Sequence, residues 1–349
     1  MEKNHRPIPR LDIALFLIIF CPLMLGGQID AYHSFNFKKA DSIASLYQGE
    51  DLSNLFDLSL KLSKPLDTDL ERFRAIYLWI CQNIKNDYRG TERASHARRK
   101  YQSDSSAYQK WASNFRMESL QTLAKDRKGN CYSYSFLLSE MSKIAGIDCI
   151  IIGGYGRLAN SNTSSLGLPN HSWNAVKLEG SWYLCDPTWS SGYIIHDGQV
   201  GFYEAQFNSG YFLCPPEHFI LNHLPLDTSH SFLNESPSKD EFLSRPILYG
   251  AAFEHGLFPN SNLAFENFYY RGDTIEWILN WAGTEPPTNL TLEVESAFHN
   301  YQLPLKAEIR PEQKIIRIKY VFERSGSRIL HFKMKGQILF SCKAEISKS

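Results

Sequence analysis

A single cysteine stands where the sequence changes from a glycine turn to an expected helix. Cys131 follows Gly129 and Asn130, and the apolar side chains behind it keep helical spacing up to Gly146. The start of a helix has unpaired backbone N–H groups and the positive end of the helix dipole, which both favour a thiolate. The same N–H groups can hold an oxyanion. The cysteine is therefore a candidate nucleophile, although buried and inert cysteines are common.

A histidine and an aspartate farther along the chain could activate such a nucleophile. Residues 171–178 and 181–186 have strand patterns on either side of a Glu-Gly turn, which predicts a β-hairpin. If the turn is symmetric, Trp173 faces Asp186, and His171 lies diagonally opposite Asp186 on the same face, within reach of a hydrogen bond. An asymmetric turn would shift the register by one residue and send Asp186 to the other face. The hairpin thus permits a base with an orienting carboxylate.

The elements ahead of the cysteine are predicted to be mainly helical. Residues 41–62 have a helical pattern that breaks before a proline. Thr68 and Glu71 form a capping box, and the apolar residues behind them keep helical spacing up to Ile84, so a core helix is expected there. Residues 89–100 carry five basic side chains and one glutamate. We interpret them as a solvated loop rather than a flap that faces an anion or a substrate.

The second half of the chain is predicted to be rich in β-strands. Residues 149–152 have a strand pattern, and residues 159–170, which are rich in Ser, Asn and Gly, are expected to be a loop. From about residue 242 on, short runs of β-favouring residues alternate with turn residues, as is typical of an immunoglobulin-like sandwich. We expect strands there at 275–279, 290–294, 314–321 and 329–332.

The composition is that of a globular protein and argues against several kinds of partner. Of the 349 residues, 43% are hydrophobic and 21% are charged, as in ordinary globular domains. The 37 basic residues balance the 37 acidic residues, so no whole-chain charge favours nucleic acid or an anionic membrane as a partner. The sequence shows no glycine-rich phosphate loop, and we expect no cofactor.

The N-terminus predicts export. Lys3, Arg6 and Arg10 precede an apolar run at residues 13–25, which two glycines follow. A basic start, a short apolar segment and small residues describe a secretory signal, and the run is shorter than the roughly 20 residues that span a bilayer. We therefore expect residues 1–27 to be a signal peptide and the protein to be periplasmic or extracellular. An uncleaved signal anchor is the alternative, and it would be the only contact with a membrane.

Three motifs together resemble those of the transglutaminase-like superfamily. They are, in this order, Gly-Asn-Cys at 129–131, His-Ser-Trp-Asn-Ala-Val at 171–176 and Trp-Tyr-Leu-Cys-Asp-Pro-Thr-Trp at 182–189. Residues 74–84 are similar to the helix before the nucleophile of that superfamily, and residues 211–225 are similar to its kyphoscoliosis-peptidase branch. Because several motifs agree in order and spacing, the resemblance is specific for the middle of the chain.

The resemblance implies a transglutaminase-like (papain-like) core, and together with the immunoglobulin-like sandwich predicted behind it the fold class is α+β. We expect a helical lead-in at 28–64, a transglutaminase-like catalytic domain at 65–235 and a β-sandwich domain at 240–349. One departure from the family pattern lies beside the nucleophile, where Asn130 and Ser133 replace an aliphatic residue and a glycine. The groove next to the cysteine is therefore expected to differ from that of related enzymes.

The resemblance further implies a cysteine-dependent acyl transfer on protein or peptide amides. Cys131 would attack a carbonyl as a thiolate, His171 would take and return the proton, and Asp186 would hold the imidazole in place. The backbone N–H of the cysteine would stabilise the oxyanion, and Trp111 and Gln121 are upstream candidates for a side-chain donor. Hydrolysis by a peptidase or amidase is preferred to crosslinking, because the sequence marks no amine site and no calcium cluster.

A catalytically silent scaffold or binding protein with the same fold is the alternative to the enzyme. The intact set of cysteine, histidine and aspartate favours the enzyme, whereas the changed residues around the cysteine keep the scaffold open. A metal site is not expected, because Cys214, His218 and His223 lack a fourth partner and a zinc-site spacing. The two histidines are expected to pack in the proline-rich segment around them.

Overall fold

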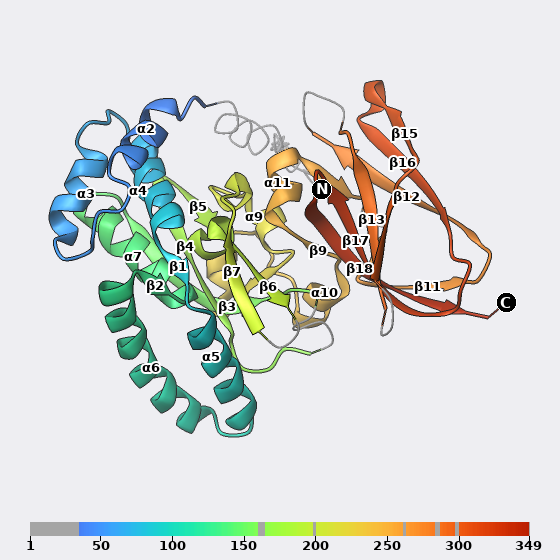
Figure 1. The fold of residues 1–349 in the computed structure, drawn as a ribbon, viewed down its shortest axis with the longest axis horizontal. Helices are drawn as coiled ribbons and strands as arrows, with labels where there is room; N and C mark the ends of the chain where they lie inside the picture. Colours follow the sequence, from blue (N-terminus) through green and yellow to red (C-terminus); the bar gives the residue numbers. More distant parts are fainter. Residues whose placement is uncertain are drawn as a thin grey trace, which may run out of the picture. The chain divides into compact units, whose positions relative to one another are not determined.

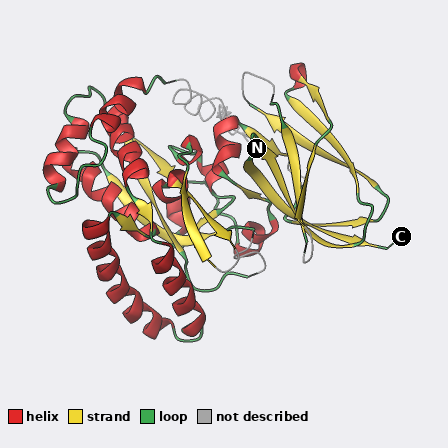
Figure 2. Ribbon diagram, viewed as in Figure 1, coloured by secondary structure: helices red, strands yellow, loops and turns green. Residues whose placement is uncertain are grey.

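A computed structural model describes residues 35–159, 165–197, 200–260, 263–282, 287–296 and 300–348 of the protein (Figure 1). The expected signal segment, residues 1–27, lies outside these ranges. No helix within them is both long and apolar enough to cross a bilayer. Helices and strands mix in the first two thirds of the chain, whereas the last third is almost entirely strands (Figure 2). The chain therefore has the expected α+β fold with a β-rich C-terminal region.

Two short helices precede the core helix. They are α2 (Lys38–Leu46) and α3 (Leu55–Ser63), so the prediction of one continuous helix over 41–62 is wrong. The break has a local cause, because Gly49 takes a positive φ of 84°, which other residues rarely adopt. The Asn54 side chain then starts α3 by accepting a hydrogen bond from the backbone three residues on.

The core helix α4 (Asp69–Asn83) begins at the predicted capping box. The Thr68 hydroxyl accepts a hydrogen bond from the Glu71 N–H, and the Glu71 carboxylate accepts one from the Thr68 N–H in return. Residues 73–81 are all buried, so this helix is packed on every side. It lies against α2 and α3 and forms the centre of the N-terminal helices (Figure 1).

Two helices, α5 (Tyr88–Lys100) and α6 (Ser105–Asp126), then lie side by side (Figure 1). The prediction of a loop over 89–100 is wrong. Arginine and lysine are good helix formers, so the basic run is the exposed side of a helix whose Ala97 is buried. Strand β1 (Lys85–Asn86) precedes these two helices in the sequence, and β2 (Lys128–Gly129) follows them. The two short strands pair in parallel.

Helix α7 (Cys131–Ile144) packs on an antiparallel sheet of four strands with the order β5-β4-β3-β8. The observed pair of Asn174 and Cys185 shows that the Glu-Gly turn is symmetric, which is the register that brings the histidine near the aspartate. The Asn174 amide donates to the Ser135 carbonyl and so fixes the sheet against the helix. The strands are β3 (Cys149–Gly156), β4 (His171–Leu178), β5 (Ser181–Cys185) and β8 (His223–Pro225).

Short elements lead from this sheet to the C-terminal part. They are α8 (Pro187–Ser191), the hairpin of β6 (Gly192–Asp197) and β7 (Val200–Ala205), η1 (Ser209–Tyr211), α9 (Pro216–Phe219), η2 (Thr228–Ser231), α10 (Lys239–Ser244), β9 (Ile247–Leu248) and α11 (Gly250–His255). The buried Arg157 guanidinium donates to the main-chain carbonyls of Phe242, Leu243 and Arg245. These carbonyls lie at the C-terminal end of α10, where the helix dipole favours a cation.

The C-terminal part is a β-sandwich, as predicted. Its two sheets have the orders β10-β12-β16-β15 and β11-β18-β17-β13-β14. Trp277 from the first sheet and Phe332 from the second meet edge to face at 4.9 Å between ring centroids, so the core lies between the sheets. The strands are β10 (Leu257–Pro259), β11 (Glu266–Tyr270), β12 (Thr274–Trp281), β13 (Leu290–Glu295), β14 (Asn300–Pro304), β15 (Ala307–Arg310), β16 (Ile315–Val321), β17 (Gly326–Met334) and β18 (Gln337–Ser347), with η3 (Pro311–Gln313) between β15 and β16.

Strand β9 links the sandwich with Asn222, the residue before β8. Leu248 pairs with Phe340 of β18, so β9 extends the six-stranded sheet although it precedes the other strands of the sandwich in the sequence. Helix α11 also lies against both η1 and β18. The hydrophobic core accordingly continues from Trp173 of β4 into the sandwich.

Candidate active site

The candidate nucleophile stands at the N-terminus of α7. Cys131 is the first residue of this helix, and Asn130 is its N-cap. The Asn130 side-chain oxygen accepts a hydrogen bond from the Ser133 N–H at 3.1 Å, and its amide donates to Ser119 Oγ on α6 at 2.9 Å. The two residues that depart from the family pattern therefore act together. They cap the helix and tie its first turn to α6.

His171, the first residue of β4, contacts the cysteine through one ring nitrogen and an aspartate through the other. Its Nε2 lies 2.7 Å from Asp186 Oδ2, which leaves Nδ1 for the interaction with the Cys131 thiol that shifts the pKa of both groups. The Trp189 indole stacks on the imidazole with 4.6 Å between ring centroids. With Asp186 at its edge and Trp189 on its face, the imidazole has little freedom to turn.

Asp186 has no exposed surface and is surrounded by N–H groups and imidazoles. Its Oδ1 accepts hydrogen bonds from the N–H groups of Thr188 at 2.8 Å and Trp189 at 3.1 Å, so the residue is the N-cap of α8. Its Oδ2 faces the Nε2 atoms of His171 and His223, at 2.7 and 3.1 Å. A buried carboxylate needs partners of this kind to stay ionised.

The three groups shift one another's pKa values. Burial alone would raise the pKa of Asp186, but the charges and hydrogen bonds of His171 and His223 hold it well below its usual range. Burial would lower the pKa of His171, but Asp186 and Cys131 raise it more, to about 10. Burial would raise the pKa of Cys131, but the hydrogen bond and charge of His171 lower it below its ordinary value. These shifts favour a thiolate–imidazolium pair beside a carboxylate.

The other cysteines in the described ranges differ from Cys131 in the direction of their pKa shift. All six, Cys131 included, are free thiols. Burial raises the pKa of the other five, which makes them poor nucleophiles. The five are Cys149 and Cys342, each with a pKa of about 12, and Cys81, Cys185 and Cys214, each with a pKa well above its usual range.

His223 is the part of the site that sequence reasoning missed. It was expected only to pack in the proline-rich segment, but β8 pairs with β3 and brings its ring to Asp186. Its Nδ1 lies 2.6 Å from Asn222 Oδ1. Burial lowers the pKa of His223, and the hydrogen bond and charge of the Asp186 carboxylate oppose this shift. The one signal in the sequence was the likeness of residues 211–225 to the kyphoscoliosis-peptidase branch.

Two of these histidines and the aspartate could also be considered as metal ligands. In the part of the chain that the structure describes, His171, Asp186 and His223 are the one such group, with donor atoms within 4.8 Å of one another. Donors that share a zinc ion at about 2.0–2.1 Å stand roughly 3.3 Å apart in tetrahedral geometry. The observed separations of 2.7 and 3.1 Å are instead hydrogen-bond distances. The arrangement therefore fits shared protons better than a metal ion.

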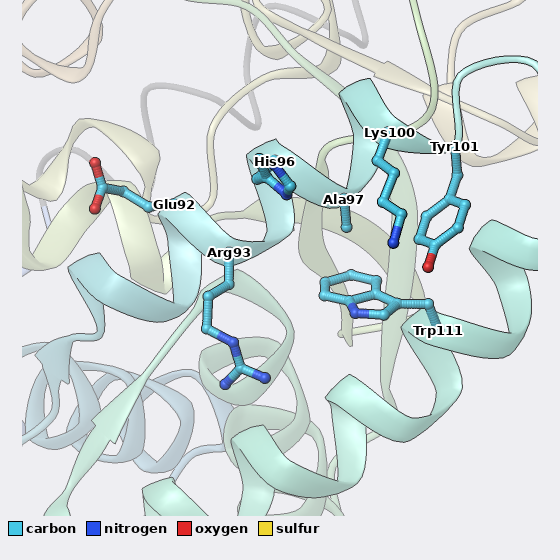
Figure 3. A pocket seen from close by; sticks show the side chains of 7 residues that line it. All are labelled: Glu92, Arg93, His96, Ala97, Lys100, Tyr101 and Trp111. Carbon is cyan, nitrogen blue, oxygen red and sulfur yellow. The ribbon is translucent and has the colours of Figure 1, made fainter.

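A pocket of about 370 Å³ opens between α5 and α6 (Figure 3). In Figure 3 the Lys100 side chain extends toward the ring of Trp111. Of the two candidate side-chain donors for an oxyanion, Trp111 lines this pocket and Gln121 is exposed on α6. The lining is mostly basic and aromatic, and its Arg93 is paired with Glu118 of α6 at 2.7 Å. It consists of Glu92, Arg93, His96, Ala97, Lys100, Tyr101 and Trp111.

Part of this chain is similar to a protein family and to several known proteins. Residues 57–187 match the family model described as the transglutaminase-like superfamily. The kyphoscoliosis peptidases of Mus musculus and Homo sapiens are each 32% identical to this chain over 208 residues, which are 59% of this chain and 28% of the relative. Hillarin of Drosophila melanogaster is 25% identical over 232 residues, which are 63% of this chain and 26% of the relative. The chain thus spans about a quarter of the length of these relatives.

Proposed function

Because the chain carries a transglutaminase-like domain similar to the kyphoscoliosis-peptidase branch, we propose that it is a cysteine-dependent acyl-transfer enzyme that hydrolyses protein or peptide amides. The observation that carries the proposal is the line of contacts from Cys131 through His171 to the buried Asp186. It offers a thiolate at a helix N-terminus, a base beside the thiolate and a carboxylate that orients the base.

In the first half of the proposed reaction, an acyl group moves to the enzyme. The Cys131 thiolate attacks the carbonyl carbon of an amide, and a C–S bond forms. Backbone N–H groups at the start of α7 stabilise the negative oxygen. The His171 imidazolium then gives its Nδ1 proton to the amide nitrogen, the C–N bond breaks, and the amine leaves. The products are a thioester on Cys131 and a neutral imidazole.

In the second half, the thioester is cleaved. His171 Nδ1 takes a proton from a water molecule, whose oxygen attacks the thioester carbon. The C–S bond breaks, the thiolate returns and a carboxylic acid leaves. Asp186 stays ionised throughout and holds the Nε2–H of His171, so that Nδ1 faces the reacting atoms. We propose water rather than an amine as acceptor, because the His171 side chain is only 6% exposed and water reaches such a site more easily than a lysine of a second protein.

The first test is alkylation of the folded protein with iodoacetamide against pH, with the modified sites read by mass spectrometry. We expect Cys131 to react alone among the six described cysteines, with a midpoint below about 8.5, the ordinary thiol value. The His171→Ala variant should lose this reactivity, and the Cys149→Ala variant should keep it. If Cys131 is inert at every pH, the enzyme is excluded and the silent scaffold takes its place.

The second test separates hydrolysis from crosslinking. Casein is incubated with the protein in the presence and absence of a fluorescent primary amine. Release of peptides without uptake of the amine, lost in the Cys131→Ala variant, supports a hydrolase. Uptake of the amine that depends on Cys131 would show a crosslinking enzyme instead.

A further inference from the structure

A second histidine lies against the carboxylate of the candidate site. His223 Nε2 is 3.1 Å from Asp186 Oδ2, the same oxygen that faces His171. The His223 side chain has no exposed surface. Its ring is packed between aromatic rings, which fix its orientation. They belong to Phe219, Trp189 and Trp173, at 3.9, 4.4 and 5.0 Å between ring centroids.

The Asn222 side chain contacts Nδ1 of His223, at the edge of the ring away from Asp186, and its own hydrogen bonds determine which of its atoms faces that nitrogen. Its amide nitrogen donates to the Leu248 carbonyl and, at 3.0 Å, to the Tyr211 hydroxyl. Because a carbonyl can only accept, the amide cannot be flipped, and its oxygen must point toward His223 Nδ1, which lies 2.6 Å away. Nδ1 of His223 therefore carries a proton and donates it to Asn222, and Nε2 needs a second proton to donate to the Asp186 carboxylate, so the ring in this arrangement is an imidazolium.

The packed His223 ring also limits the movement of Asp186. The Oδ1 atom of Asp186 is held by two backbone N–H groups of α8. With these donors alone, the carboxylate could still turn and carry Oδ2 away from His171. The rigid His223 ring beside Oδ2 restricts this rotation. The ring thereby fixes the position of the oxygen to which His171 Nε2 is hydrogen-bonded.

The same contacts continue into the sandwich. Leu248 belongs to β9, which pairs with Phe340 of β18. An unbroken series of side-chain hydrogen bonds therefore runs from His171, which interacts with the Cys131 thiol, to the edge of the six-stranded sheet. Its members, in order, are His171, Asp186, His223, Asn222 and the carbonyl of Leu248.

We propose that Asn222 and His223 are positioning residues, which hold Asp186 in the orientation that His171 needs and anchor it to strand β9 of the sandwich sheet. The inference rests on the proposed function for its effect on the reaction. The contact of His171 with Asp186 that the inference predicts can be measured whether or not the protein turns over a substrate. The sandwich would then support the site through the hydrogen bond of Asn222 to β9, without contacting the substrate.

Replacement of His223 tests the first link. Phenylalanine suits the same aromatic surroundings but has no nitrogen, whereas glutamine can still donate to Asp186. We expect His223→Phe to lower the rate of Cys131 alkylation near neutral pH by about tenfold, as loss of an outer hydrogen-bond partner commonly does. His223→Gln should recover most of the rate. His331→Phe is the matched control, because it removes a buried histidine of the sandwich.

The alkylation is followed as a full pH profile, which a purely structural role would not shift. The charged groups that face His223 are Asp186 and His171, and Tyr211 beside it stays neutral because burial raises its pKa well above the usual value. We expect the midpoint of the profile to move upward in His223→Phe and to stay in place in His331→Phe. Thermal unfolding of each variant separates loss of folding from loss of positioning.

Replacement of Asn222 tests the anchor. Asn222→Ala should change Cys131 alkylation in the same direction as His223→Phe, by about threefold, and the double variant should be no slower than His223→Phe alone, because residues that act in series are not additive. The control is Asn267→Ala, which also removes an amide that donates to main-chain carbonyls. Additive effects of the two substitutions would contradict the series.

Nuclear magnetic resonance of protein labelled with ¹⁵N-histidine reads the geometry without any reaction. We expect a low-field Nε2 proton of His171, bound to Asp186, that is lost or broadened in His223→Phe. If Cys131 is inert but this signal depends on His223, the proposed enzyme fails while the positioning holds. A His223→Phe variant with the wild-type signal and alkylation profile overturns the inference. A wild-type signal that changes on treatment with EDTA would also overturn it, in favour of a metal ion.

Discussion

The backbone of Gly156 lies directly against the imidazole of His171. A methyl group at this glycine would stand 3.0 Å from both Cβ and Cγ of the histidine, closer than such contacts normally are. The two residues meet because β3 and β4 are neighbouring antiparallel strands. The absence of a side chain at Gly156 therefore sets how deep the imidazole lies beside Cys131.

Gly156→Ala should displace the imidazole and slow the alkylation of Cys131. The added methyl group pushes His171 by a few tenths of an ångström, and we expect a loss of about tenfold, because small misplacements of a catalytic group are costly. Stability should fall by about 1 kcal/mol, the lower end for overpacking. Gly153→Ala is the matched control on the same strand, because a methyl group there meets nothing within 4 Å. Equal rates in both variants would show that the glycine does not position the ring.

Asp186→Asn should remove the reactivity of Cys131 while leaving the fold in place. The asparagine oxygen can still accept from the N–H groups that cap α8, but its amide presents hydrogens to His171. Nε2 of His171 must then accept, its proton moves to Nδ1, and Nδ1 can no longer take a proton from the thiol. We expect alkylation near neutral pH to fall by about a hundredfold or more.

The control for this substitution is Asp227→Asn. Asp227 caps η2 by accepting from the Ser229 N–H, in an exposed position away from the thiol. It should leave the alkylation rate unchanged. Rates measured by mass spectrometry and melting temperatures measured by circular dichroism decide the comparison. An Asp186→Asn variant that reacts like wild type would show that the carboxylate does not orient the base.

The relation between His171 and Asp186 was predictable because the turn between their strands is local and regular. Glu179 and Gly180 both have positive φ, 49° and 85°, as a two-residue turn that matches the twist of the strands requires. Such a turn allows only one register, and the observed pairs follow it. A prediction from the sequence therefore succeeds where a few neighbouring residues determine the geometry.

His223 and α5 could not be predicted, for two different physical reasons. His223 lies 37 residues from Asp186 in the sequence and reaches it through the pairing of β8 with β3, which no local pattern encodes. In α5, the charge run indicates exposure but not backbone conformation, and a solvated loop and the exposed side of a helix have the same signal. Long-range pairing and exposed helices are thus where sequence reasoning was weakest.

Removal of the Cys131 thiol should make the stability of the protein depend on pH. In Cys131→Ala, Asp186 still raises the pKa of His171 above its ordinary value of 6.5, so the folded state holds a proton that the unfolded chain has lost. As the pH rises above 6.5, the free energy of unfolding should fall by about 1.4 kcal/mol per pH unit more than in wild type. In wild type, the folded state has lost a proton from Cys131 that the unfolded chain keeps, and this offsets the histidine.

Urea unfolding at several pH values between neutral and mildly alkaline measures the difference. The free energy of unfolding should fall more steeply with pH in Cys131→Ala than in wild type. The double variant Cys131→Ala with His171→Gln should have the wild-type slope again, because it has neither group. A Cys131→Ala variant with the wild-type slope would contradict the thiolate–imidazolium pair.

Asn130→Ala should affect both the stability of the protein and the position of the nucleophile. Asn54 caps α3 in the same way, by accepting from the Asp57 N–H at 3.0 Å, so Asn54→Ala is the matched control. Both substitutions should cost about 1 kcal/mol in urea unfolding, as the loss of an N-cap does.

Only Asn130→Ala also releases the first turn of α7 from Ser119. We therefore expect Cys131 alkylation to slow about tenfold in Asn130→Ala alone, the lower end for a lost outer hydrogen bond. Equal rates in the two variants would mean that the cap stabilises α7 without placing the thiol.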